Sequence, residues 1–485
     1  MEWVIANMAP LMFGALVVFL LFGYPVAFAL AANGIVFGLI GIELGLLQPA
    51  LFQALPERIF GIMSNDTLLA IPFFTFMGLI LERSGMAEDL LDTIGQLFGP
   101  LRGGLAYAVI FVGALLAATT GVVAASVISM GLISLPIMLR YGYDKRLASG
   151  VIAASGTLAQ IIPPSLVLII MADQLGKSVG DMYEGAMIPG LILTGLYVGY
   201  VAILTVIKPN AAPALPPEAR TLRGFKLLLR VITTMVPPLL LIFLVLGTIF
   251  LGIATPTEGG AMGAAGALIL AIARKRLSFK LLKQAMETTG KLTSFVVFIL
   301  VGSTVFGLVF RAVNGDLWVE HLLLSLPGGQ MGFLIVVNIL VFLLAFFLDF
   351  FELSFIIVPL LAPVADKLGI DLIWFGVLLA VNMQTSFMHP PFGFALFYLR
   401  SVAPASVKTT DIYWGAVPFV CIQIIMVAIV IIFPGIVSYG DPAERARIEQ
   451  SGDVDLGSLM QQGGMSGSEQ KDPSELLKQL QQDAK

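Results

Sequence analysis

The most constraining feature of this sequence is an internal repeat. About residues 104–172 and about residues 331–399 align at a fixed offset of 227 with no gap, and the offset is set by the pairs Pro163-Pro164 and Pro390-Pro391. Three further identities follow at that offset: Pro136 with Pro363, Gly142 with Gly369, and Asp144 with Asp371. In each copy, a segment long enough for a helical hairpin precedes an apolar helix that two prolines interrupt. This arrangement is typical of membrane folds in which a binding site lies between two related halves.

The composition indicates a membrane protein. The chain is 58% apolar and 12% charged, whereas a soluble domain has about 25% charged residues. Apolar runs approaching 20 residues recur, and each can cross a hydrocarbon core about 30 Å thick as a helix. Helices must dominate because backbone groups find no water in lipid. We therefore predict an all-α polytopic membrane protein that contacts the lipid bilayer, and we expect no nucleic-acid partner.

We predict two repeats of five membrane spans each, and in both a re-entrant hairpin precedes the fourth span. Because five is odd, the repeats must have opposite orientations in the membrane. A Pro-rich, basic connection joins them, and a polar tail follows the second repeat. The predicted ranges are 1–207 for the first repeat with its hairpin at 104–140, 208–230 for a cytoplasmic linker, 231–437 for the second repeat with its hairpin at 331–366, and 438–485 for a disordered tail.

The placement of positive charge predicts the orientation. With the N-terminus outside, the predicted inner loops and the linker hold 18 of the 27 Lys and Arg residues, and the predicted outer loops hold four. Because Lys and Arg concentrate on the cytoplasmic side, both termini are predicted to be periplasmic. Segments 48–64, 85–98 and 277–290 mix apolar and charged residues at helical spacing, and we predict that they are separate helices that lie along the membrane surface or brace the scaffold.

The first hairpin turns within small residues, from Thr120 and Gly121 to Ser126. A hairpin tip at membrane depth leaves backbone groups unpaired, so it must be buried in protein or line a wet cavity. Small side chains allow close approach to a ligand or partner helix. Tight helix packing through Ala and Thr is the alternative interpretation.

The helix break after this hairpin carries Ser155, Gly156 and Thr157 ahead of Pro163 and Pro164. Two prolines remove two backbone donors and free carbonyls one turn earlier. Freed carbonyls and hydroxyls suit Na⁺, and the half-helix that starts after the break suits a carboxylate. A simple proline kink is the alternative. The second break repeats the polar pattern, with Asn382, Gln384, Thr385 and Ser386 ahead of Pro390 and Pro391.

The second hairpin carries two acidic residues, Asp349 and Glu352, where the first has Val122 and Ala125. Charges within an apolar segment are costly and indicate a functional role. We assign Asp349 to cation binding, and Glu352 to proton transfer or to the outer mouth of the site. Solvation of both acids at the membrane interface is the alternative. His389 is either a titrating group or a packed, hydrogen-bonded residue.

Several enzyme classes are excluded. The sequence has no Walker A loop, and its two His and one Cys cannot form an HExxH site or the usual zinc and haem sites. We therefore expect no enzyme and no resident cofactor. The segment from Thr255 to Glu258 predicts a capped helix start with Pro at the first turn.

At these residues the sequence resembles the DctM-like large membrane subunit, the permease subunit, of tripartite ATP-independent periplasmic (TRAP) transporters. The resemblance covers nearly all of residues 1–437. The segments that carry it are 252–258, the arm at 121–131 with Pro136, 142–144, 156–165, and 382–391 with Phe397.

The resemblance implies an inverted-repeat, elevator-type secondary transporter of the bacterial inner membrane. It implies import of an organic acid, with Na⁺ as the coupling ion. Two partners are implied: a periplasmic substrate-binding protein that delivers the acid, and a separately encoded small four-helix membrane subunit. Because selectivity would rest largely with the binding protein, the sequence does not identify the acid.

Cation sites in this family are built from the hairpin tips and the adjacent helix breaks. By position, the resemblance extends this role to Thr120, Gly121, Ser126, Ser155, Gly156, Thr157, Asp349, Asn382, Gln384, Thr385 and Ser386. The family often has Ser-Gly-Ser at the first tip, whereas this chain has Thr120-Gly121-Val122. Val122 therefore supplies no side-chain ligand.

Two other functions remain open. The first is a stand-alone ion-coupled organic-anion transporter that needs no binding protein. The second is an intramembrane enzyme or energy-coupling subunit that uses Asp349, Glu352 and His389 as a proton path.

Overall fold

The described part of the chain is entirely helical in its regular elements, as predicted. The computed structural model describes residues 2–120, 123–346, 348–391 and 393–439. The predicted tail beyond Tyr439 lies outside them. The first eleven α-helices are α1 Glu2–Ala6, α2 Met8–Leu21, α3 Val26–Glu43, α4 Leu55–Met63, α5 Ala70–Arg83, α6 Met86–Phe98, α7 Gly104–Thr120, α8 Val123–Arg140, α9 Lys145–Thr157, α10 Leu166–Leu175 and α11 Val179–Ile207. The other ten are α12 Gly224–Phe250, α13 Pro256–Ala273, α14 Phe279–Ala312, α15 Gly315–Leu324, α16 Gly329–Leu344, α17 Phe350–Glu352, α18 Val358–Lys367, α19 Leu372–Met383, α20 Phe394–Val402 and α21 Thr409–Ile432.

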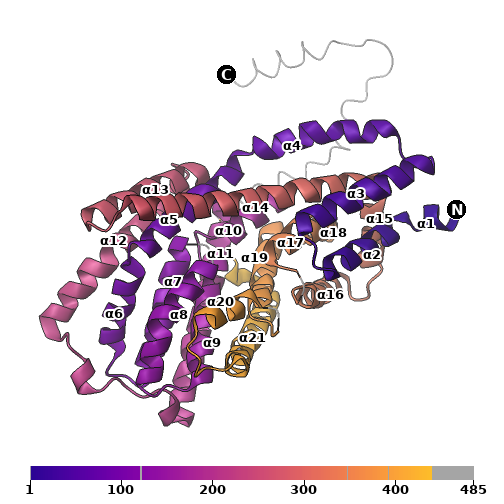
Figure 1. The fold of residues 1–485 in the computed structure, drawn as a ribbon. Coiled ribbons are helices and arrows are strands. Elements are labelled where there is room, and N and C mark those ends of the chain that lie inside the picture. The colour runs from indigo at the N-terminus through magenta and orange to yellow at the C-terminus, as the bar shows by residue number, and fades with distance from the viewer. Residues whose placement is uncertain (1, 121–122, 347, 392, 440–485) are drawn as a thin grey trace, which may run out of the picture. The chain divides into compact units, whose positions relative to one another are not determined.

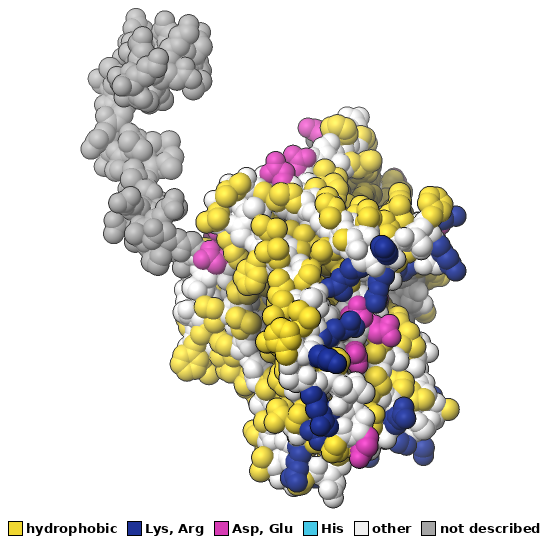
Figure 2. Space-filling model, turned by 90° about the vertical axis from the view of Figure 1, so that its left-hand side faces the viewer, with side chains coloured by type: hydrophobic (Ala, Val, Ile, Leu, Met, Phe, Trp, Pro, Cys, Tyr) yellow, Lys and Arg dark blue, Asp and Glu magenta, His cyan; other side chains and the backbone are white. Residues whose placement is uncertain are grey.

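The lengths and surfaces of the helices are those of a multi-pass membrane protein. Within the described residues, seven helices are long and apolar enough to cross a membrane, or nine if two bent helix pairs are counted as spans. Large apolar side chains are open to the surroundings, such as Val206 at 80% and Phe243 at 71%. Figure 2 shows a face covered largely by hydrophobic side chains, with Lys and Arg gathered in a band beside a few acids. Lipid contact accounts for such exposed apolar surface.

The two copies detected in the sequence adopt matching helices. Helix α8 begins at Val123 and ends at Arg140, and the arm formed by α17, a π-turn at Leu353–Ile357 and α18 begins and ends 227 residues later. Helix α19 likewise begins 227 residues after α9. The connections match too, because Gly142 and Gly369 both have positive φ, 82° and 70°. The side chains of Asp144 and Asp371 both accept backbone N–H groups at helix N-termini.

Each copy contains a helical pair that turns back on itself. In the first, α7 and α8 pack side by side in Figure 1, and the two residues that join them lie outside the described residues. The phenol of Tyr143, in the turn that follows α8, accepts the backbone N–H of Leu105 at 3.1 Å. Burial raises the pKa of Tyr143 to about 12, so the contact persists at physiological pH.

One of the three predicted separate helices is wrong. The segment 277–290 is not a separate element, because α14 runs without interruption for 34 residues from Phe279 to Ala312. Gly290 adopts helical geometry, and neither it nor Lys291 breaks the backbone hydrogen bonding. The charged residues near the start of α14 precede its apolar part, and the helix continues through the boundary between the two.

Glycines bring several helix pairs into backbone contact. A Cβ on Gly150 of α9 would lie 2.1 Å from the Gly415 carbonyl oxygen of α21. A Cβ on Gly302 of α14 would lie 2.4 Å from the Ala27 carbonyl oxygen of α3. Small residues allow such approaches in membranes, where dispersion contacts replace the hydrophobic effect between helices. These contacts fix α21 against α9 and α14 against α3.

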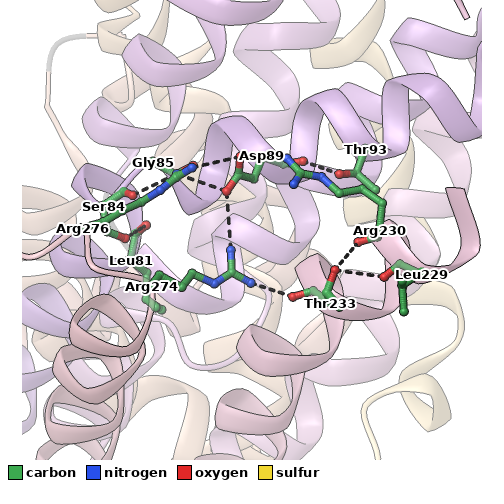
Figure 3. Close-up of polar contacts among 10 residues, drawn as sticks. All are labelled: Leu81, Ser84, Gly85, Asp89, Thr93, Leu229, Arg230, Thr233, Arg274 and Arg276. Atoms are coloured by element: carbon green, nitrogen blue, oxygen red, sulfur yellow. Dashed lines mark hydrogen bonds and ion pairs between the residues drawn. The ribbon is translucent and has the colours of Figure 1, made fainter. Parts of the chain in front are cut away.

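A charge cluster ties α6 to three other parts of the chain (Figure 3). The Asp89 carboxylate on α6 lies 3.2 Å from Arg230 of α12, 3.5 Å from Arg274 and 3.1 Å from Arg276, which follow α13. Arg276 also donates to the carbonyls of Ser84 and Gly85, which precede α6. A shared carboxylate in a network of this kind is held more firmly than an isolated surface pair.

Candidate functional site

The first helix break is bridged by a serine. Helix α9 ends at Thr157 and α10 begins at Leu166, and a 3-10 turn and the cis pair Pro163-Pro164 lie between them. The hydroxyl of Ser165 donates to the carbonyl of Gln160 at 2.6 Å, so it satisfies a carbonyl that the broken helix leaves free. The predicted break is confirmed, and its polar residues are buried.

The second break has the same form. A 3-10 turn and the cis pair Pro390-Pro391 separate α19 from α20. The Thr385 hydroxyl donates to the Asn382 carbonyl at 2.7 Å. The Asn382 amide donates to the carbonyl and side-chain oxygens of Asn338 at 2.8 and 3.0 Å. These bonds tie the break to α16, the first helix of the second hairpin.

The two breaks meet in the interior of the protein. The side-chain amide of Gln384 donates to the Thr157 carbonyl at 2.6 Å, and these two positions are 227 residues apart. A further amide, Gln423 of α21, donates to the Thr157 hydroxyl at 3.4 Å and to the Tyr197 phenol at 3.0 Å. Thr157 and Gln384, which the sequence predicted as site residues in separate halves of the protein, are therefore in direct contact.

Several oxygens around this junction are buried without a hydrogen-bond partner among the described residues. They include Ser155 Oγ, Gln384 Oε1 and Ser386 Oγ. Buried polar atoms are nearly always paired in folded proteins. Hydroxyl and amide oxygens that lack a donor are the ligands that a hard cation prefers.

The first hairpin packs against the first break through Ser126 and Val127 of α8 and Gly156 of α9. Ser126 on α8 is fully buried. A Cβ on Gly156 would lie 2.3 Å from the Val127 side chain of α8, so the hairpin rests directly on the break. Of the predicted tip residues, Gly121 lies outside the described residues, and the backbone of Thr120 ends α7.

The second hairpin tip is organised by its two acids. The Asp349 side chain accepts the Glu352 N–H at 3.0 Å, and the Glu352 carboxylate accepts the Asp349 N–H at 3.0 Å. This reciprocal capping box starts the second arm of the hairpin. Both acids also line a cavity.

This central cavity has a volume of about 490 Å³. It lies where both hairpins and both broken helices face α3 and α14. Its lining includes Val123 and Ala124 of the first hairpin, Gln160, Leu166 and Val167 of the first break, Asp349 to Glu352 of the second hairpin, Phe387 and Phe394 of the second break, Tyr24 and Tyr398, and Phe295 and Phe298 of α14.

The predicted site residues therefore fall into two groups. Within the described part of the chain, Asp349 is the predicted ligand that lines the central cavity. The break residues Ser155, Thr157 and Gln384 are buried behind it. His389 packs with the rings of Phe342 and Phe346 at centroid distances of 4.4 and 4.1 Å, which confirms the packing, whereas its ring nitrogens have no hydrogen-bond partner among the described residues.

Three residues of the junction were missed by the sequence analysis: Asn338, Gln423 and Tyr197. Asn338 and Gln423 are isolated amides in otherwise apolar helices. A polar side chain in such a segment is costly and usually has a specific partner, so both carried a usable signal. Tyr197 carried none, because tyrosines are common in membrane helices.

A further prediction concerns a helix cap. At the start of α13, Thr255 and Glu258 form a reciprocal capping box, which confirms that predicted cap.

Named transporter proteins align with most of this chain. The chain is 31% identical over 392 residues to the C4-dicarboxylate TRAP transporter large permease protein DctM of Pseudomonas aeruginosa, across 81% of this chain and 90% of that protein. It is 28% identical over 391 residues to the sialic acid TRAP transporter permease protein SiaT of Haemophilus influenzae, across 80% of this chain and 62% of that protein. A third relative is the isethionate TRAP transporter permease protein DctMQ of Oleidesulfovibrio alaskensis, 27% identical across 82% of this chain and 61% of that protein.

A solved structure shares the fold. The Alcanivorax borkumensis YdaH transporter superposes with a TM-score of 0.57 and 14% sequence identity, over 80% of this chain and 90% of that one. Residues 13–436 match the family described as the DctM component of the tripartite ATP-independent periplasmic transporters. The chain belongs to this family and is a TRAP transporter large permease subunit.

Proposed function

We propose that this subunit imports an organic acid, a carboxylate, by Na⁺-coupled secondary transport across the bacterial inner membrane. A periplasmic substrate-binding protein delivers the acid, and a small four-helix membrane subunit completes the permease. Both termini of the large subunit are periplasmic, in keeping with the distribution of Lys and Arg.

The observation that supports Na⁺ coupling is the meeting of the two breaks. Gln384 and Thr157 are in contact there, and Ser155 and Ser386 add buried hydroxyls without partners among the described residues. A bound Na⁺ would be coordinated by these oxygens in place of the hydrogen-bond donors that they lack. An ion at this place orders both breaks at once and so couples its own binding to the shape of the neighbouring cavity.

The central cavity supports the binding of a carboxylate. Helices α8, α10 and α20 each place first-turn residues on its wall, through Val123, Leu166 and Phe394. Helix N-termini carry unpaired N–H groups and a partial positive charge, which favour an anion. The relatives are named for C4-dicarboxylates, sialic acid and isethionate, so membership of the family leaves the acid open.

We further propose that the two repeats are inverted and that the protein works as an elevator. The two hairpins and the broken helices that follow them move as one body. Helices α3, α5, α13 and α14 belong to the scaffold along which that body slides. The proposed ion and substrate contacts are Thr120, Gly121, Ser126, Ser155, Gly156, Thr157, Asp349, Asn382, Gln384, Thr385 and Ser386.

Na⁺ binding is tested on the full chain in lipid nanodiscs. The thermal midpoint is measured as NaCl replaces KCl at constant ionic strength, for the unaltered protein and for Thr385→Ala. We expect Na⁺ to stabilise the unaltered protein and the variant to need about tenfold more Na⁺ for half of the effect, which corresponds to about 1.4 kcal/mol.

The matched control is Thr248→Ala, which removes a threonine hydroxyl that bonds within α12 to the Leu244 carbonyl at 2.9 Å. We expect its Na⁺ response to equal that of the unaltered protein. Equal stabilisation by Na⁺ and K⁺ in the unaltered protein would overturn Na⁺ coupling. An unchanged response in Thr385→Ala alone would remove Thr385 from the site.

A further inference from the structure

The central cavity has an electrostatic character that a simple organic acid does not match. Its described lining includes two carboxylates, Asp349 and Glu352, and no Lys, Arg or His. A dicarboxylate or any other plain anion placed there faces like charge without a cationic side chain to offset it. The wall is complementary to a ligand that also carries positive charge.

Aromatic rings reinforce this preference. Phe295 of α14 and Phe351 beside the acids meet edge to face, with ring centroids 5.7 Å apart and planes at 89°. Phe394 and Tyr398 of α20 stack at 6.4 Å on the same cavity. The faces of aromatic rings attract ammonium groups, and more strongly where water is excluded.

A buried amide next to the cavity offers a further polar contact. Gln160 is 2% exposed, lines the cavity, and has a side-chain oxygen without a hydrogen-bond partner among the described residues. Such an oxygen accepts a hydrogen bond from an ammonium N–H. Gln160 lies in the 3-10 turn that leads to α10, whose first-turn residues Leu166 and Val167 also line the cavity.

These observations assign the two charges of a ligand to different walls. We propose that the transported acid is a zwitterion: a carboxylate on a compact apolar body that also carries a positively charged nitrogen. The nitrogen lies against Asp349, Glu352 and the aromatic rings, and the carboxylate faces the first turn of α10. This inference rests on the proposed function and narrows its substrate class.

Asp349 and Glu352 can face a positively charged nitrogen and still form their capping box. Their reciprocal contacts engage Asp349 Oδ1 and Glu352 Oε2 with backbone N–H groups. A Gln at position 352 keeps an oxygen that can accept the Asp349 N–H, as capping boxes allow. Glu352→Gln therefore removes charge and preserves the turn.

The test compares zwitterions with acids of closely matched shape that lack the charged nitrogen. The pairs are glycine betaine with 3,3-dimethylbutanoate, leucine with 4-methylpentanoate, and phenylalanine with 3-phenylpropanoate. Each compound is titrated against the full chain in nanodiscs in NaCl, and the thermal midpoint gives an apparent Kd. We expect at least one zwitterion to bind about tenfold more tightly than its partner.

In Glu352→Gln we expect that preference to fall to about twofold or less, with the Na⁺ response retained. The matched control is Glu43→Gln, at the exposed end of α3, which should keep the full preference. Tighter or equal binding of the carboxylates that lack the charged nitrogen, or no shift with any zwitterion, overturns the inference. If Na⁺ still stabilises the protein in those cases, the proposed coupling stands; a loss of Na⁺ selectivity would instead overturn the proposed function.

Discussion

The two hairpins have the same helical layout and different chemistry. The second arm of each covers the same 18 positions at the offset of 227, yet α8 is a regular helix, whereas the arm from Phe350 to Lys367 contains a π-turn. The first tip has Val122 and Ala125 where the second has Asp349 and Glu352. π-turns occur often at functional sites, so the second hairpin combines the irregular backbone with the charged groups of the cavity.

Packing against the following helix differs in a complementary way. In the first copy, Gly156 lies against Val127. At the equivalent positions of the second copy, Met383 lies near Ser354, with 3.8 Å between the sulfur and the hydroxyl. The larger side chain lies on the hairpin in the first copy and on the following helix in the second.

Each hairpin also has a polar bond to α5 or α14 at nearly equivalent positions of the repeat. Ser129 of α8 donates to the Glu82 carboxylate of α5 at 2.5 Å. In the second hairpin, Ser303 of α14 donates to the Phe355 carbonyl of the π-turn at 2.6 Å. The first bond engages a side-chain carboxyl group and the second a backbone carbonyl.

The largest effect is expected from Gly156→Val. The added side chain meets Val127 and its backbone, and overpacking of this kind costs about 1–3 kcal/mol. Thermal unfolding in nanodiscs measures the loss, and Val127→Ala in the same chain should recover part of it. Gly195→Ala is the control, because a Cβ there meets nothing within 4 Å. Full stability of Gly156→Val would show that this contact is loose.

A smaller difference should separate Ser129→Ala from Ser303→Ala. Loss of the Ser129 hydroxyl leaves Glu82 without its donor, and Glu82 Oε2 is already buried without a partner among the described residues. An unpaired buried group costs about 1–3 kcal/mol, and more if charged. Ser303→Ala leaves a neutral carbonyl and should cost about 1 kcal/mol or less. Glu82→Gln in the Ser129→Ala chain should restore stability, and equal losses from both serines would refute the distinction.

The smallest effects concern the capped tip. Asp349→Ala removes the side chain that accepts the Glu352 N–H and should cost about 1 kcal/mol of stability. Asp349→Asn retains an N-cap acceptor and should cost only a few tenths of a kcal/mol. Thermal midpoints of the two variants separate capping from charge. A large loss in Asp349→Asn would mean that the charge itself stabilises the turn.

The sequence predicted the fold well because its strongest signals are local. Both breaks were placed because each proline pair is preceded by polar residues and recurs at the matched offset, which also placed both hairpins. A proline pair alone does not end a helix, since Pro237 and Pro238 lie within α12. The uninterrupted course of α14 was missed because charge at the membrane boundary resembles the composition of a surface helix. Whether a helix continues through that boundary depends on its partners, here α3 and α5, which a local pattern does not contain.

The candidate site was predicted in part. The contact between Gln384 and Thr157 joins segments more than 200 residues apart, so only the tertiary packing reveals it. The partners Asn338 and Gln423 come from helices outside the breaks and were overlooked. The capping box of Asp349 and Glu352 was also missed, although an acid followed three residues later by Glu carries a signal for it.

The bond between Gln384 and Thr157 has a consequence for how the two copies can differ in sequence. It joins equivalent positions, yet it is not reciprocal: the second copy contributes a long amide side chain and the first a backbone carbonyl. Because a carbonyl is present whatever the residue, the first copy can change its side chain at position 157 and still accept this bond. The unequal residues of the two breaks are therefore compatible with one shared contact.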